Sequence, residues 1–122
     1  MNMMIPKTEF RRMPKYLKYI RTLPCVVCVA EGKRKGTTNI EAAHVRFISP
    51  SGLGLKPCDS KCVPLCGTHH RAQHRRGERL WWESQELDPR EITDKLWDIY
   101  NKFENPAKAW MDAILYVESI HG

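Results

Sequence analysis

Three histidines and a cysteine lie within the segment PLCGTHHRAQH, which runs from Pro64 to His74. The chain contains five histidines, so most of them fall in this one segment. Thiolate sulfur and imidazole nitrogen are the ligands with which proteins bind zinc and related transition metals. The segment therefore predicts metal binding, and the spacing of its ligands indicates how many ions are bound.

A structural zinc site is predicted from two ligand pairs. Cys25 and Cys28 form a CxxC pair, and Cys66 and His69 form a CxxH pair after an interval of thirty-seven residues. Together they provide the Cys3His set that is typical of tetrahedral structural zinc. The alternative is a pair of buried cysteines that pack as small hydrophobic side chains. A redox-active CxxC is a lesser alternative, because the flanking sequence does not indicate a βαβ unit.

Two further cysteines, Cys58 and Cys62, stand close to the CxxH pair. Either one is able to replace a zinc ligand or to contribute to a second cluster. Packing as a small hydrophobic side chain is the favoured interpretation, because Cys62 belongs to the apolar run CVPL.

The two remaining histidines of the segment, His70 and His74, are spaced to chelate a second ion. On a helix, residues four apart project from one face, whereas His70 points about 100° away from His69. A site with only two protein ligands keeps open positions, which is typical of catalytic metals. An exposed histidine pair without metal is the alternative. Upstream, His44 is the candidate general base, because a neutral imidazole accepts a proton near neutral pH.

The elements that must position these residues predict an α+β fold in a single domain over 1–122. Its parts are a basic helix over 14–23, a zinc-stabilised core over 24–77 and a helical part over 88–120. Within the core, the alternating segment 39–48 and the CVPL run read as strands, and a short helix ends at Gly77. Strand, loop, strand and helix make a ββα unit in which His44 is able to face the helix.

Apolar side chains at helical spacing mark core faces in the C-terminal part rather than a functional stripe. They are Ile92, Leu96, Ile99 and Phe103, followed by Trp110, Ala113, Ile114 and Val117. The adjacent Trp81 and Trp82 are able to stack on an unpaired base, but core packing is the favoured interpretation for at least one of them.

Charge is distributed unevenly along the chain. Residues 1–80 carry 16 Lys and Arg against 5 Asp and Glu, a balance of +11, while residues 81–122 carry 4 against 9, a balance of −5. A basic surface attracts a polyanion such as nucleic acid, although a solvated basic surface is an equal alternative. The candidate phosphate contacts are Arg46, Arg71, Arg75 and Arg76.

Apolar runs long enough for a signal peptide or a membrane span are absent from the sequence. This predicts a soluble, cytoplasmic protein that does not bind membranes. Five cysteines in a reducing compartment argue for metal binding rather than for a disulfide framework.

The segments CVVC, AHVRF, VPLC and HHRAQH, in this order and spacing, resemble the HNH, or ββα-metal (His-Me finger), endonuclease superfamily. More narrowly, AHVRF, GLGLKPCD and VPLCGTHHRAQHRRGE, followed by a tryptophan and a helix that begins at LDP, resemble the Ref-type phage recombination-enhancement nucleases. Those nucleases act with RecA. The resemblance covers roughly residues 20 to 100.

This resemblance implies a zinc-stabilised ββα-metal core, with flanking helices, that cuts DNA in phage recombination or DNA processing. His44 takes the place of the general base, and His70 and His74 take the places of metal ligands on the helix. The implied catalytic ion is Mg²⁺ or Mn²⁺, with Zn²⁺ as an alternative. Single- or double-stranded DNA is the implied substrate, a RecA filament is a candidate partner, and the host cell is bacterial or phage-infected.

Two positions depart from the superfamily pattern. Ala43 stands where many members carry a third metal ligand, and Lys61 stands near the usual place of an asparagine. Asp59 is the preferred third ligand, since the Ref-type pattern also carries an aspartate after Lys-Pro. Glu41 and water molecules are the alternatives.

Two non-catalytic functions remain open beside the nuclease. One is a zinc-stabilised DNA-binding module in which His44, His70 and His74 take no part in catalysis. The other is a protein-interaction adaptor that docks through its acidic helical tail.

Overall fold

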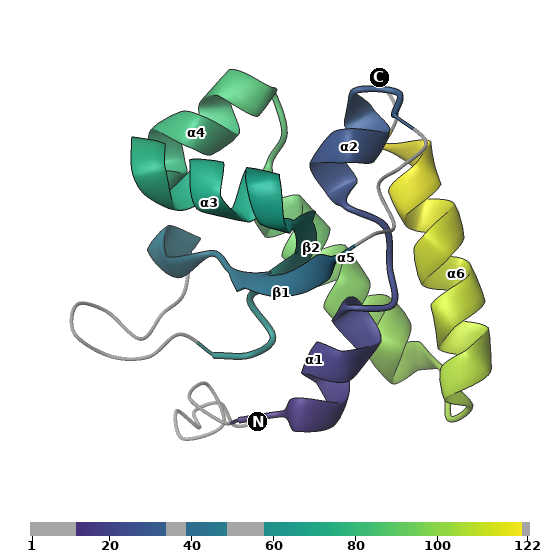
Figure 1. Cartoon of the computed structure of the whole chain (residues 1–122). Coiled ribbons are helices and arrows are strands. Elements are labelled where there is room, and N and C mark those ends of the chain that lie inside the picture. The colour runs from purple at the N-terminus through teal and green to yellow at the C-terminus, as the bar shows by residue number, and fades with distance from the viewer. Residues whose placement is uncertain (1–11, 34–38, 49–57, 121–122) are drawn as a thin grey trace.

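The computed structural model of the chain describes residues 12–33, 39–48 and 58–120 (Figure 1). The glycine-rich loop predicted over 49–57 lies outside the described residues. Helix α1 (Pro14–Ile20) begins with the expected proline, and the short helix α2 (Val26–Ala30) follows it. The side chain of Cys25 caps α2 by accepting a hydrogen bond from the Cys28 N–H at 3.4 Å.

A two-stranded antiparallel sheet follows, made of β1 (Ile40–His44) and β2 (Cys62–Cys66). Its register places Ile40 opposite Cys66 and His44 opposite Cys62. The predicted first strand extends over 39–48, but β1 is shorter, and a 3₁₀ helix, η2 (Arg46–Ile48), takes the place of its second half.

Helix α3 (Gly67–Arg76) continues directly from β2 and ends at Gly77. Gly77 has a φ of 86°, a left-handed backbone conformation that glycine adopts without strain. The predicted order of strand, strand and helix is therefore confirmed for the segment 40–76. Helices α1, α3 and α5 all contact this hairpin, and Figure 1 shows α1 and α3 on opposite sides of it.

Three helices complete the chain: α4 (Glu78–Gln85), α5 (Pro89–Lys102) and α6 (Pro106–Ser119). Helix α5 begins at Pro89 with Asp88 as its N-cap, in line with the helical part predicted from residue 88. Helix α6 also begins with a proline, and its N-cap is Asn105, whose side chain accepts the Ala107 N–H. The fold is thus α+β, mostly helical, with one small sheet among the described residues.

The hydrophobic core joins the hairpin to the helices around it. Trp81 and Trp82 are both buried, which confirms core packing for this pair. The Trp82 indole N–H donates to the buried Gln73 side-chain oxygen at 2.8 Å and so ties α4 to α3. No helix in the described residues has the length and apolar character needed to cross a membrane.

The core face of α6 differs from the prediction at one residue. Ala113 and Val117 are buried as expected, but Trp110 is 40% exposed, and the core position one residue before it belongs to Ala109. Ala109 is fully buried, and its carbonyl accepts a hydrogen bond from the Tyr19 hydroxyl of α1 at 3.0 Å. A large indole at that position would keep α1 and α6 apart.

Candidate metal centre and histidine sites

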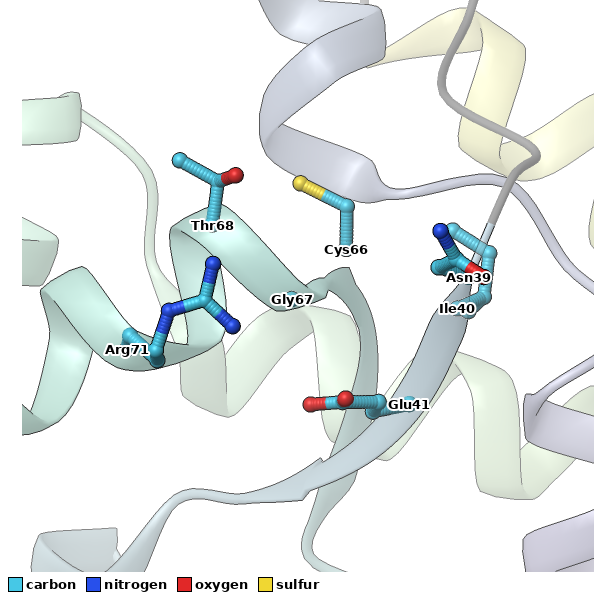
Figure 2. Close-up of a pocket in the computed structure, with 7 residues that line it drawn as sticks. All are labelled: Asn39, Ile40, Glu41, Cys66, Gly67, Thr68 and Arg71. Carbon is cyan, nitrogen blue, oxygen red and sulfur yellow. The ribbon is translucent and has the colours of Figure 1, made fainter.

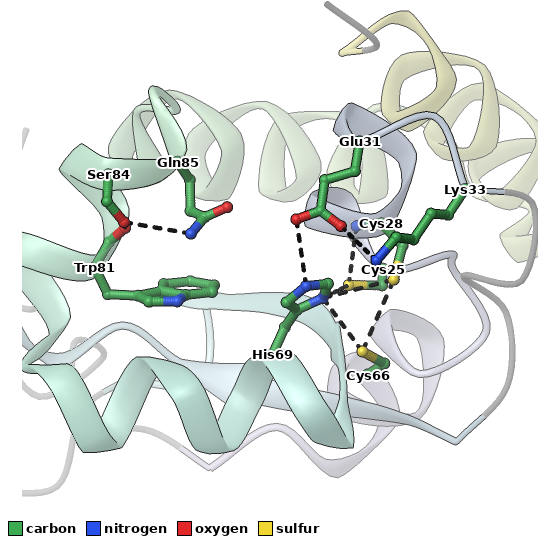
Figure 3. A network of polar contacts seen from close by, with 9 residues as sticks. All are labelled: Cys25, Cys28, Glu31, Lys33, Cys66, His69, Trp81, Ser84 and Gln85. Carbon is green, nitrogen blue, oxygen red and sulfur yellow. Dashed lines mark hydrogen bonds and ion pairs between the residues drawn. The ribbon is translucent and has the colours of Figure 1, made fainter.

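The four predicted zinc ligands meet in one cluster, although they come from three elements (Figure 3). Cys25 and Cys28 lie at the start of α2, Cys66 ends β2, and His69 stands in the first turn of α3. Their ligand atoms all lie within 4.8 Å of one another. Among the described residues, this is the one group of three or more potential ligands gathered so tightly.

The distances inside the cluster fit a tetrahedral zinc ion. The Cys28 and Cys66 sulfur atoms are 3.8 Å apart, and His69 Nδ1 lies 3.3–3.5 Å from the three sulfur atoms. Bond lengths of about 2.3 Å for Zn–S and about 2.0 Å for Zn–N, at tetrahedral angles, give separations of roughly 3.8 Å and 3.5 Å. A Cys3His cluster that is able to hold a metal such as zinc is therefore part of this fold.

Burial keeps the thiols of the cluster protonated when no cation is bound. Burial raises the pKa of the Cys28 thiol to about 12 and also raises the pKa of Cys25. A bound metal reverses this preference, because coordination deprotonates a thiol outright. Metal binding at this cluster therefore releases protons from the cysteine thiols.

The outer nitrogen of His69 faces a carboxylate. Glu31 Oε2 lies 3.6 Å from His69 Nε2, and the other Glu31 oxygen forms an ion pair with Lys33 at 3.0 Å (Figure 3). A carboxylate behind an imidazole ligand fixes the ring orientation and leaves Nδ1 for the metal. Sequence spacing alone does not identify Glu31, which lies outside both ligand pairs.

Cys58 and Cys62 lie outside this cluster. Cys62 is fully buried in β2, and Cys58 is 2% exposed, with the Ser60 hydroxyl donating to its sulfur at 3.3 Å. Cys62 therefore packs as a small hydrophobic side chain, in line with its apolar neighbours.

His70 and His74 face each other on α3. Their Nε2 atoms are 3.2 Å apart, and Glu41 on β1 contacts His70 Nδ1 at 2.6 Å. Two nitrogen ligands bound to one ion at about 2.1 Å lie roughly 3.0–3.4 Å apart, so the pair has the spacing of shared coordination. Glu41 contacts Nδ1, the ring nitrogen of His70 that does not face His74. A carboxylate in this place orients a metal-ligating imidazole.

Asp59 lies elsewhere, against His44. His44 Nε2 is 2.9 Å from Asp59 Oδ1, and the same carboxylate accepts hydrogen bonds from the Met13 N–H at 2.6 Å and from Arg12 at 3.2 Å. Burial favours a higher pKa for Asp59, but these donors outweigh it and hold the pKa below its ordinary value. An ionised Asp59 favours the tautomer of His44 that carries its proton on Nε2, in which Nδ1 is the proton acceptor.

The structure separates His44 from the histidine pair. On a regular strand, residues three apart point to opposite faces, so His44 and Glu41 leave β1 on different sides. Asp59 joins His44 to the segment before α1, whereas Glu41 faces α3. In the described part of the chain, no contact joins His44 to His70 or His74, and the buried Ala43 adds no ligand.

We expect Asp59→Asn to lower the free energy of unfolding by about 1–3 kcal/mol, because hydrogen bonds to a buried carboxylate are lost or weakened. The native pKa of Asp59 is lowered, so this stabilisation is present at neutral pH and disappears as the pH falls through the folded-state value. Urea denaturation at pH 7 measures the cost. Asp94→Asn is the control, since its carboxylate is 70% exposed and forms an exposed ion pair with Lys61 at 3.4 Å. An equal cost for both variants would contradict the prediction.

A hollow of about 520 Å³ opens at the start of α3, beside both metal-ligand groups (Figure 2). Glu41 and Arg71 point toward each other across it, and the Thr68 side chain lies at its rim. Arg71 is exposed, as are the other three predicted phosphate contacts, Arg46, Arg75 and Arg76.

Fold and site together define a small α+β protein built around a Cys3His metal-ligand cluster. Residues 1–95 match the model of the family described as "Protein of unknown function (DUF968)", and the chain belongs to this family. Comparison of the chain with curated proteins and with solved structures finds no match.

Proposed function

We propose that this chain is a metal-dependent endonuclease that hydrolyses DNA phosphodiester bonds. The observation that carries the proposal is the convergence of His70 and His74, whose Nε2 atoms are 3.2 Å apart next to a separate Cys3His cluster. The first turn of α3 contributes His69 to the four-ligand Cys3His cluster. The residues that follow on this helix, His70 and His74, form a two-ligand site that leaves coordination positions open for substrate or water. The resemblance of the ββα segment to HNH endonucleases supports the same function.

Each residue has a distinct role in this proposal. His70 and His74 hold Mg²⁺ or Mn²⁺, or alternatively Zn²⁺, and Glu41 orients His70 through its Nδ1. A divalent ion at this place supplies Lewis acidity toward the phosphate and the leaving oxygen. His44 takes a proton from the attacking water at Nδ1, while Asp59 holds its Nε2.

The substrate must lie across the end of β1 for these roles to combine. His44 is the last residue of β1, about 10 Å along the strand from Glu41. We expect a phosphodiester bound at this end of the two-stranded sheet to reach side chains on both of its faces. Arg71 beside the hollow, with the other exposed arginines of α3 and η2, is then placed to contact neighbouring phosphates.

A zinc-stabilised DNA-binding module without catalysis is the second candidate. The observation that favours it is the engagement of His44 with the buried Asp59, which gives His44 a role in joining β1 to the segment before α1. Phage recombination and a RecA filament as partner stay predictions from the resemblance.

A cleavage assay on supercoiled and single-stranded DNA with added Mg²⁺ or Mn²⁺ tests the proposal. We expect the wild type to cut and His70→Ala to lose cleavage while it keeps its zinc and its fold. Leu115→Ala is the control, because Leu115 is 62% exposed on α6, outside the ββα segment. A wild type that binds DNA tightly but cuts with neither ion would contradict the nuclease and favour the binding module.

A further inference from the structure

A second hollow, of about 250 Å³, lies where η2 meets α4 and the start of α5. Helix η2 follows His44 closely in the sequence. Phe47 lines it together with Arg79 and Arg90, and the edge of Trp82 contributes to its wall. Its volume is below the roughly 300–1,000 Å³ of sites that take whole drug-sized ligands, so it suits one small planar group.

Phe47 is held firmly at this position. Its backbone N–H donates to Glu78 Oε1 at 3.0 Å, which fixes η2 to the first residue of α4. The ring is half-buried, and two guanidinium groups approach it, Arg79 at 4.8 Å and Arg90 at 5.5 Å from the ring centroid. An aromatic ring and two cations therefore converge on one small hollow.

The two arginines lack a neutralising partner within the described residues. Glu83 and Asp88 also line the hollow, but neither forms an ion pair with Arg79 or Arg90. The Asp88 side chain instead accepts the Arg90 backbone N–H at 2.9 Å as the cap of α5. The two carboxylates are thus not paired with the guanidinium groups that lie over the Phe47 ring. The arginine-lined face of the hollow favours a ligand that combines a flat π system with a negative charge.

We propose that this hollow binds an unpaired nucleobase of a DNA strand together with its phosphate. The base stacks on Phe47 or on a guanidinium plane, and Arg79 and Arg90 contact the phosphate. A paired base reaches such a hollow only after it leaves the duplex, which costs unstacking energy. The site therefore selects single-stranded over double-stranded DNA. The inference rests on the proposed function in one respect, namely that the ligand is the DNA strand cut beside His44.

Binding of a fluorescent oligothymidylate and of a matched duplex, without added Mg²⁺ or Mn²⁺, tests this inference apart from cleavage. We expect Phe47→Leu to weaken single-strand binding roughly tenfold and to leave duplex binding unchanged, while Phe47→Tyr keeps the wild-type affinity. The double variant Arg79→Gln/Arg90→Gln alters only exposed side chains. It should weaken single-strand binding. It should also lower the slope of the logarithm of the binding constant against the logarithm of the salt concentration by the amount expected for about two phosphate contacts.

The chain offers a matched control at the far end of α5. Lys102 lies over the Phe103 ring at 5.7 Å, about 18 Å along the helix from Arg90. Phe103→Leu and Lys102→Gln should leave single-strand binding unchanged. Thermal unfolding and zinc content verify that each variant is folded.

Equal losses for single strand and duplex, or no loss in either the Phe47→Leu or the double-arginine variant, would overturn the inference. So would a mononucleotide that binds this hollow as tightly as the oligonucleotide does. If the wild type cuts DNA but these variants bind normally, the hollow fails and the nuclease stands. If the variants lose single-strand binding but the wild type never cuts, the hollow stands and the nuclease fails.

Discussion

Chelation of a zinc ion held by the Cys3His cluster, or replacement of Cys66 with alanine, is expected to unfold this protein. Its ligands join α2, the end of β2 and the start of α3, so their loss disconnects three elements. The apparent binding free energy of structural zinc in small domains is about 10–16 kcal/mol, comparable with the whole stability of about 5–15 kcal/mol of an ordinary domain. Loss of helical circular dichroism with one equivalent of zinc released measures the effect.

Cys62→Ala is the matched control for the zinc prediction. Cys62 is as deeply buried as Cys25 but lies outside the metal-ligand cluster. We expect it to lower the free energy of unfolding by only about 1 kcal/mol, the cost of a small cavity, and to keep one zinc per chain. A Cys66→Ala protein that stays folded and binds no zinc would show that the cluster does not stabilise the fold.

Replacement of His44 with alanine is expected to lower the rate of DNA cleavage by about 10²–10⁴-fold, the usual contribution of a general base. Asp59 lies 2.9 Å from His44 Nε2, so Nδ1 is the atom that would accept the proton in the proposed reaction. Single-turnover cleavage at saturating Mn²⁺ separates this loss from weaker DNA binding.

Added imidazole distinguishes a base from a structural residue. We expect imidazole to restore part of the cleavage by His44→Ala, because a free imidazole is able to occupy the vacated space and accept the proton. It should not restore His70→Ala to the same extent, because that variant lacks a proposed metal ligand. Undiminished cleavage by His44→Ala would show that another group accepts the proton.

Local signals were sufficient for most of the elements. The sequence predicted the start of the basic helix at Pro14, the end of α3 at Gly77 and the start of the helical part at residue 88, and the structure confirms these boundaries. The short helix α4 was missed, because Gly77 ends α3 and nothing in ERLWWESQ provides an N-cap side chain. The burial of Trp81 and Trp82, rather than a local signal, holds this helix in place.

Residue spacing was also sufficient to find the Cys3His ligands and to separate His69 from His70. It was not sufficient to place the carboxylates. Asp59 was expected beside the histidine pair, yet it lies against His44, Met13 and Arg12, and Glu41 contacts His70 instead. The contacts of Asp59 join residues that are 15 to 47 positions apart in the sequence. Local periodicity does not predict contacts at such separations.

By itself, the sequence determined which side chains are able to bind metal, because ligand type and helical periodicity depend only on neighbouring residues. It also determined the order of strand, strand and helix that carries them. Only the tertiary structure decided that the two ligand pairs meet at tetrahedral distances and that Asp59 belongs to His44. It also decided that Phe47 lies between two arginines. These decisions depend on how the helices pack against a two-stranded hairpin, since packing sets the distances between segments that the sequence keeps far apart.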